Sequence, residues 1–265
     1  MTVRIILAGA CLMCISCGPR AGWHVRSGPG TAGMLLSGPA TAVPVPFGVA
    51  TPDGDVGYVA GRDGGIDAID LRTGKLLWSS PEAFLPLLAV DGAVMAAAQV
   101  ADQPNAVAIL GLARADGSIV FESYPLEFPG WVRLEVHEAC CGGGVSAGGA
   151  GLMGGVLELG WSASWTCVGG ISILEDESAV GLARVDLETG SVDLLDADAG
   201  PLVVTDVPET SPLIVAGRAL FTDIRTSGTG DGDERVLVAV DAETGEHLWE
   251  RPIRPPLAVP VCTAM

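Results

Sequence analysis

The chain has 265 residues and a formal net charge of −18, with 49% hydrophobic but only 17% charged residues. This length gives room for one large all-β domain or two small ones. The negative charge, without a basic stripe to offset it, excludes nucleic acid as a partner and excludes peripheral binding to anionic lipid without a covalent anchor.

Residues 1–17 are typical of a bacterial lipoprotein export signal. The apolar stretch Ile5–Ser16 has the length of a signal peptide and is too short to span a bilayer. It ends in Cys17, and small residues before a cysteine resemble a lipobox, in which the cysteine is diacylated and becomes the new N-terminus. Cys11 and Cys14 are rival acceptors, and plain secretion or an uncleaved anchor are the alternatives to lipidation. We expect an exported protein that is lipid-anchored in the bacterial cell envelope, facing the periplasm or the cell surface.

Residues 18–41 are rich in Gly, Pro, Ser and Ala. Such a composition predicts a flexible tether that holds the following domain away from the membrane. Residues 42–265 then form one domain, and 37 glycines among many short apolar runs favour strands joined by tight turns.

An internal repeat is the strongest feature of the sequence. Residues 68–78 read Ala-Ile-Asp-Leu-Arg-Thr-Gly-Lys-Leu-Leu-Trp, and residues 239–249 read Ala-Val-Asp-Ala-Glu-Thr-Gly-Glu-His-Leu-Trp. Two weaker copies lie between them, at 112–121 and 184–194. We assign structural roles in the repeat to Ala68, Asp70, Thr73, Gly74, Trp78, Gly117, Phe121, Asp186, Thr189, Gly190, Leu194, Ala239, Asp241, Thr244, Gly245 and Trp249.

Each part of the repeat has a physical purpose. The apolar alternation before the aspartate predicts a half-buried strand. The aspartate can accept a hydrogen bond from the backbone N–H two residues on, which opens a turn. The glycine supplies the positive φ that closes a hairpin with a bulge. Four positions later comes a large apolar side chain, which is suited to fill the space between stacked sheets.

The run Ala-x-Asp-x-x-Thr-Gly-x-x-x-Trp resembles the tryptophan-docking motif of the pyrroloquinoline-quinone-like (PQQ-like) β-propeller repeat. Segments 57–64, 87–95 and 213–221 resemble the strands that precede this motif in the family. The resemblance covers roughly residues 45–260 and implies an all-β fold, a small or incomplete propeller of about four to five irregular four-stranded blades. A segment near 132–178 enlarges the third repeat as an insertion. A β-sandwich with Thr-Gly hairpins is the alternative fold.

Four cysteines follow the signal: Cys140, Cys141, Cys167 and Cys262. An even number in an exported protein predicts two disulfides, and the sequence leaves their connectivity open. The adjacent pair 140–141 also permits a vicinal disulfide against a quinone, which the resemblance to quinoprotein dehydrogenases implies. The catalytic aspartate and calcium-ligand context of those enzymes is not recognisable in this chain.

Other residues offer weaker indications of chemistry. His137 stands near Cys140 and Cys141 and is an alternative ligand for a soft metal. Residues 231–234 bring carboxylates into a Gly-rich segment, where a solvated hairpin tip is preferred over a calcium site. Residues 156–174 are apolar but interrupted by small polar residues, and are interpreted as strands of the third repeat, not a second membrane span.

We therefore expect a non-enzymatic cell-envelope lipoprotein with no cofactor and no metal, whose propeller is a scaffold for protein or peptide binding. Its partners are the membrane, through the N-terminal lipid, and an envelope protein. Two alternatives stay open. One is a quinone-dependent or remnant oxidoreductase, and the other binds a small ligand or a metal through the 132–178 insertion.

Overall fold

The computed structural model describes residues 40–132, 141–169, 172–196, 212–226 and 233–253. Every regular element in these ranges is a β-strand, so the all-β prediction is confirmed. Residues 1–17, with the lipidation site Cys17, lie outside the described residues, as does most of the expected tether. The last two tether residues, Ala40–Thr41, form strand β1, which pairs with β12.

The strands form four antiparallel sheets, numbered here in chain order. Sheet 1 contains β2 (Val43–Val45), β3 (Gly48–Ala50), β4 (Val56–Ala60), β5 (Ile66–Asp70) and β6 (Leu76–Ser80). Sheet 2 contains β7 (Leu85–Val90), β8 (Ala93–Gln99), β9 (Ala106–Ala113), β10 (Ile119–Glu122) and β11 (Leu126–Glu127). Sheet 3 contains β1, β12 (Cys141–Met153), β13 (Val156–Gly169), β14 (Ser172–Asp186) and β15 (Val192–Asp196). Sheet 4 contains β16 (Leu213–Val215), β17 (Arg218–Thr226), β18 (Asp233–Asp241) and β19 (His247–Ile253).

Each sheet is built mainly as a meander of strands that follow one another in the chain; the exceptions are β1, which pairs with β12, and β11, which pairs with β9. Short Gly-containing turns make this possible, because a tight hairpin can join only antiparallel neighbours. The central strands are buried on both faces: β8 and β9 are almost entirely buried. Sheets buried on both faces need cover from other sheets, and in this chain the neighbouring sheets supply it.

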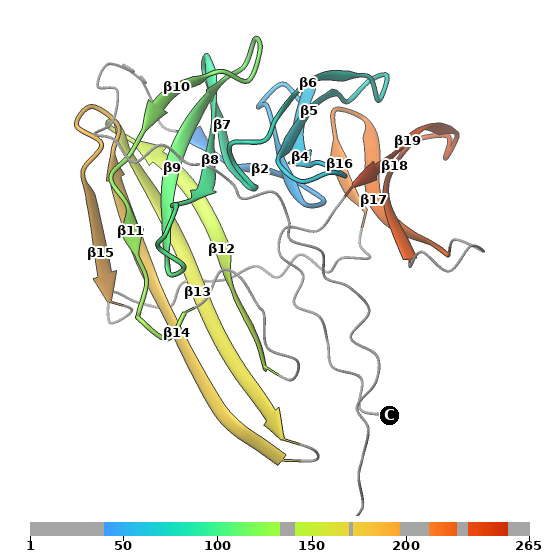
Figure 1. Ribbon diagram of the computed structural model, residues 1–265. Coiled ribbons are helices and arrows are strands. Elements are labelled where there is room, and N and C mark those ends of the chain that lie inside the picture. The colour runs from blue at the N-terminus through green and yellow to red at the C-terminus, as the bar shows by residue number, and fades with distance from the viewer. Residues whose placement is uncertain (1–39, 133–140, 170–171, 197–211, 227–232, 254–265) are drawn as a thin grey trace, which may run out of the picture.

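The order of the sheets in space differs from their order in the chain. In Figure 1 they stand side by side in the order sheet 3, sheet 2, sheet 1, sheet 4, from left to right. The last sheet therefore lies beside the first. Three apolar clusters fill the three junctions, one between sheets 2 and 3, one between sheets 1 and 2, and one between sheets 1 and 4.

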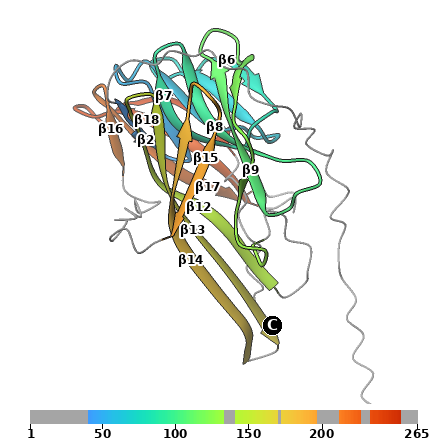
Figure 2. The same cartoon turned by 90° about the vertical axis from the view of Figure 1, so that its left-hand side faces the viewer.

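Sheet 3 is the longest of the four. Strands β12, β13 and β14 extend well beyond the edge of the other sheets in both views (Figures 1 and 2). The expected insertion near 132–178 supplies much of this ribbon, and the apolar run 156–174 lies largely in β13 and β14, as its strand interpretation requires. Among the described residues, the structure contains no helix that is long and apolar enough to cross a membrane.

Candidate functional site

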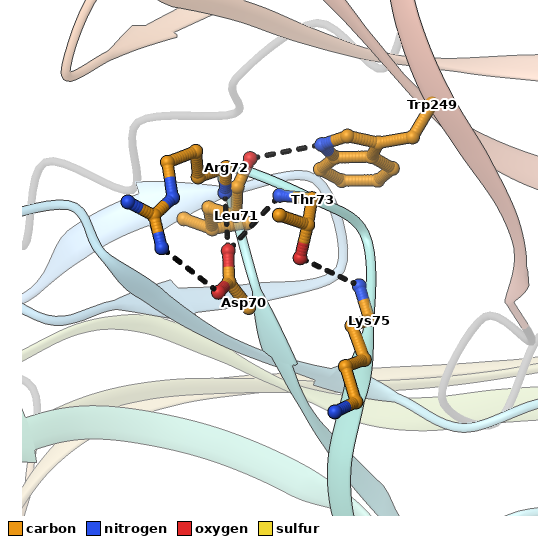
Figure 3. Close-up of polar contacts among 6 residues, drawn as sticks. All are labelled: Asp70, Leu71, Arg72, Thr73, Lys75 and Trp249. Atoms are coloured by element: carbon orange, nitrogen blue, oxygen red, sulfur yellow. Dashed lines mark hydrogen bonds and ion pairs between the residues drawn. The ribbon is translucent and has the colours of Figure 1, made fainter.

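The repeated turns are the best-defined local feature of the molecule. In sheet 1, the Oδ1 atom of Asp70 accepts the backbone N–H groups of Arg72 and Thr73 at 2.8 and 2.9 Å (Figure 3). Gly74 follows with φ +70° and closes the turn by donating its N–H to the Asp70 carbonyl at 2.8 Å. The aspartate therefore satisfies two N–H groups that the turn would otherwise leave unpaired.

The turns of sheets 3 and 4 repeat this pattern. Asp186 and Asp241 each accept two backbone N–H groups at 2.7 to 3.0 Å. In sheet 2, Ala113 stands in the aspartate position, and Asp116 instead accepts the N–H of Ser118 at 3.0 Å. Gly117, Gly190 and Gly245 have φ values of +75°, +75° and +73°. The predicted turn roles of the aspartates and glycines therefore agree with the structure.

A second contact also recurs in all four sheets, and the sequence analysis missed it. The N–H of the residue after the aspartate position donates to a carbonyl in the hairpin turn one strand earlier. These pairs are Leu71 to Asp55 (2.9 Å), Arg114 to Gly92 (3.0 Å), Leu187 to Gly155 (2.9 Å) and Ala242 to Gly217 (3.0 Å). Glycine in the earlier turn of three copies was the available signal.

These hydrogen bonds change the acidity of the turn aspartates. For Asp241 the N–H and hydroxyl of Thr244 lower the pKa below its usual 3.8, and for Asp186 the same groups of Thr189 do so. For Asp70, partial burial raises the pKa, but the N–H groups of Thr73 and Arg72 outweigh it and the pKa is lowered. The turn aspartates are thus held as anions in a structural role.

Trp249 joins the last sheet to the first. Its indole Nε1–H donates to the Leu71 carbonyl at 2.9 Å (Figure 3), although 178 residues separate the two. A Cβ atom added to Gly74 would lie 2.7 Å from the indole ring. Glycine is therefore required at this turn both for its positive φ and for the approach of the ring. Trp249 is 7% exposed and belongs to the apolar cluster between sheets 1 and 4.

Trp78 makes the same contact between sheet 1 and sheet 2. Its Nε1–H donates to the Arg114 carbonyl at 2.9 Å. A Cβ atom on Gly117 would lie 2.6 Å from its ring. Tyr58 packs against the other part of the indole, with ring centroids 5.7 Å apart. The two strong copies of the repeat therefore form two equivalent tryptophan–turn contacts between sheets.

Phe121 takes the tryptophan position in sheet 2 and is fully buried in the cluster between sheets 2 and 3. Phenylalanine has no N–H to donate, and the junction instead has a backbone hydrogen bond from Tyr124 to the Gly190 carbonyl at 2.9 Å. The prediction that Phe121 fills the space between two sheets agrees with its burial.

Leu194 does not occupy the equivalent position in sheet 3. Ala68 pairs with Trp78 and Ala239 with Trp249, each beside a β-bulge. Sheet 3 has no bulge there, so Leu194 pairs with Ala183. This partner is one residue away from Arg184, which holds the motif position of Ala68 and Ala239. Because side chains alternate between faces, Leu194 lies on the face of Ala183, which packs toward sheet 2. The interpretation of Leu194 as a continuation of the tryptophan position is corrected accordingly.

Polar contacts reinforce the junction between sheets 1 and 4. Arg251 of β19 forms an ion pair with Asp67 of β5 at 3.0 Å, and both side chains are mostly buried. Asp67 also accepts the hydroxyl of Ser79 at 2.6 Å. A β-bridge between Gly61 and Ile253 lies nearby. A buried charge is tolerated only when it is paired, so this pair requires that sheet 4 stay against sheet 1.

An open cleft of about 560 Å³ lies beside the turns of sheet 4. It is lined by Arg72, Ala216, Gly217, Arg218, Asp241, Ala242, Glu243 and Leu248. Its two carboxylates and two guanidinium groups offset each other, and Asp241 already serves its own turn. Glu243 is therefore the carboxylate of the cleft that is not committed to this turn.

The candidate disulfide cysteines and the alternative metal ligands fall only in part within the described residues. The backbone register places Cys141 directly opposite Cys167 across β12 and β13. Cys140, Cys262 and His137 lie outside the described residues. Within those residues, no group of three or more His, Cys, Asp or Glu side chains is placed to hold a metal ion. Glu234, from the acidic segment 231–234, instead pairs with Arg62 at 3.4 Å.

Comparison with known proteins adds no family to this picture. The chain matches no family model, and no curated protein shows significant similarity to it. The geometry itself consists of rigid turns, buried aromatic side chains and paired charges.

Proposed function

We propose that the chain is a non-enzymatic cell-envelope lipoprotein whose four sheets are the blades of a small or incomplete PQQ-like propeller. The lipid on Cys17 would hold it at the membrane, and the sheet array would act as a scaffold for a protein or peptide in the envelope. The observation that carries the proposal is the contact of Trp249 with the Asp70 turn. In this contact the indole Nε1 lies 2.9 Å from the Leu71 carbonyl oxygen. It joins the end of the domain to its beginning, as a propeller requires.

The character of the surface supports a binding role. Turns with satisfied N–H groups form a rigid rim, and rigid elements carry binding surfaces with little ordering cost. Several large apolar side chains are nevertheless exposed, among them Ile214, Ile224 and Met153 at 64%, 55% and 68%. Exposed apolar groups on a rigid body are typical of protein interaction sites.

In-cell cross-linking tests the binding role. The full-length protein, isolated from membranes after cross-linking, should carry one dominant envelope protein, and the Trp249→Ala variant should lose it because sheets 1 and 4 separate. A matched Asp91→Asn variant, at an exposed turn residue between β7 and β8, keeps the junction and controls for expression. Equal recovery of the same proteins by wild type and Trp249→Ala would argue against a scaffold.

The mass of the mature protein tests the anchor in the same sample. Cleavage before Cys17 with an added diacylglycerol and acyl chain is expected. An intact N-terminus, or a mature chain without lipid, would contradict the lipoprotein part of the proposal.

A further inference from the structure

The Asp241–Gly245 turn of sheet 4 borders the open cleft that Arg72 of sheet 1 also lines, and among the described residues it receives no tryptophan. In sheet 1, the Asp70 turn receives Trp249 from sheet 4, whereas Trp78 leaves the other face to reach sheet 2. Sheet 4 repeats this arrangement, with Trp249 directed to sheet 1. By the same arrangement, the Gly245 side of its own turn lies away from the Trp249 contact with sheet 1.

This turn is built like the two turns that receive tryptophan. The Asp241 carboxylate accepts the N–H of Thr244 at 2.7 Å, and Gly245 donates its N–H to the Asp241 carbonyl at 2.9 Å. The φ of Gly245 is +73°, against +70° for Gly74 and +75° for Gly117. Ala242 stands where Leu71 and Arg114 present the accepting carbonyls, and it makes the same N–H contact to the preceding turn.

The surroundings of the turn are different. A Cβ atom at Gly74 or Gly117 would meet an indole ring at 2.7 or 2.6 Å, but at Gly245 it would meet no atom of the described residues within 4 Å. All seven positions from 242 to 248 are exposed. Sheet 3, the preceding sheet in the chain, does not fill the turn, because its Leu194 lies on the other face.

We propose that the Asp241–Gly245 turn binds the tryptophan side chain of an extended segment of a partner protein. The indole Nε1–H would donate to the Ala242 carbonyl, and the ring would lie over Gly245, as in the two contacts within the chain. Arg72 and Arg218 offset Asp241 and Glu243 in the cleft beside the turn, which leaves Glu246 exposed on a protein with a net charge of −18. Basic residues beside the tryptophan therefore favour binding. This inference rests on the proposed scaffold function and names the chemistry of the partner.

A peptide with the chain's own docking sequence, Lys-Leu-Leu-Trp-Ser-Ser from residues 75–80, is the probe. With 5-fluorotryptophan in the peptide, fluorine NMR of a titration with the full mature protein should show a saturable shift. The same peptide with leucine in place of tryptophan should not compete. Absence of saturable binding at millimolar peptide would overturn the proposal.

Gly245→Asn is the decisive variant. Asparagine tolerates a positive φ but adds a Cβ where the indole must lie, so peptide affinity should fall at least about tenfold. Gly155→Asn is the matched control, because Gly155 also has a positive φ, +82°, and open space around its Cβ position. It should bind like wild type. Equal binding by Gly245→Asn, with unfolding temperatures matched, would overturn the assignment of the site.

Three further outcomes separate this inference from the proposed function. Peptide binding that emerges only in a Trp23→Ala variant would mean that the chain itself occupies the turn, which overturns the inference alone. A partner protein that cross-links equally to wild type and to Gly245→Asn would also overturn the inference and leave the scaffold function standing. Peptide binding without any cross-linked envelope partner would instead contradict the scaffold function.

Discussion

At the scale of single residues, two turn glycines have the same backbone and different neighbours. Gly74 and Gly245 both have a positive φ, but only Gly74 lies against an indole ring. Backbone conformation alone therefore cannot explain a difference between substitutions at the two sites. The pair separates the requirement for a turn from the requirement for tryptophan docking.

Gly74→Ala should destabilise the protein more than Gly245→Ala. Both variants incur left-handed strain of about 1–2 kcal/mol. Only the Gly74 variant also forces a methyl group into the Trp249 ring, which adds about 1–3 kcal/mol of overpacking. Denaturant unfolding of both variants measures the difference. Equal free energies of unfolding would show that Trp249 does not lie on Gly74.

The turn aspartates predict how stability depends on pH. The pKa values of Asp70, Asp186 and Asp241 lie below the ordinary 3.8 in the folded protein. Their stabilisation is therefore fully present above about pH 4 and is lost as the pH falls through the folded-state values. Asp70→Asn keeps an acceptor without a titrating proton, so its unfolding temperature should fall less than that of wild type between pH 5 and pH 2. Parallel curves of unfolding temperature against pH for the two proteins would show that titration of Asp70 does not contribute to the pH dependence of stability.

At the scale of strands and turns, the third sheet shows where sequence reasoning ends. The spacing of Asp186, Thr189 and Gly190 correctly predicts the turn, because its hydrogen bonds are local. The prediction for Leu194 is wrong, because sheet 3 lacks the bulge that shifts the register by one residue beside Trp78 and Trp249, and a bulge depends on how the strands pair. The motif identified the turns and Trp78 and Trp249. It gave no signal for the ion pair between Asp67 and Arg251, which joins distant strands.

The register of β12 and β13 leads to a prediction for the cysteines. Directly opposed residues of an antiparallel pair have Cα atoms about 4.5–5.5 Å apart, within the range of a disulfide. Because Cys141 lies opposite Cys167, we expect these two to form a disulfide under oxidising conditions. Peptide mapping without reduction should recover them as one cross-linked peptide. Recovery of Cys141 joined to Cys140 would support the vicinal alternative.

At the scale of the whole molecule, the central claim is that the last sheet packs against the first. Apolar side chains, the Arg251–Asp67 ion pair and the Trp249 hydrogen bond all lie at this junction. The two strong copies of the repeat indicated a shared structure. They did not indicate which sheets are neighbours. Each motif describes only its own hairpin and the tryptophan that packs on another sheet, without saying which sheet that is.

The chemical shifts of the glycine α-protons test this claim most directly. An indole ring over a glycine moves its α-protons upfield, so Gly74 and Gly117 should be shifted and Gly245 should not. Trp249→Leu should return Gly74 to its ordinary shift and leave Gly117, under Trp78, unchanged. A Gly74 shift equal to that of Gly245, with Gly117 shifted normally, would show that sheet 4 does not pack on sheet 1.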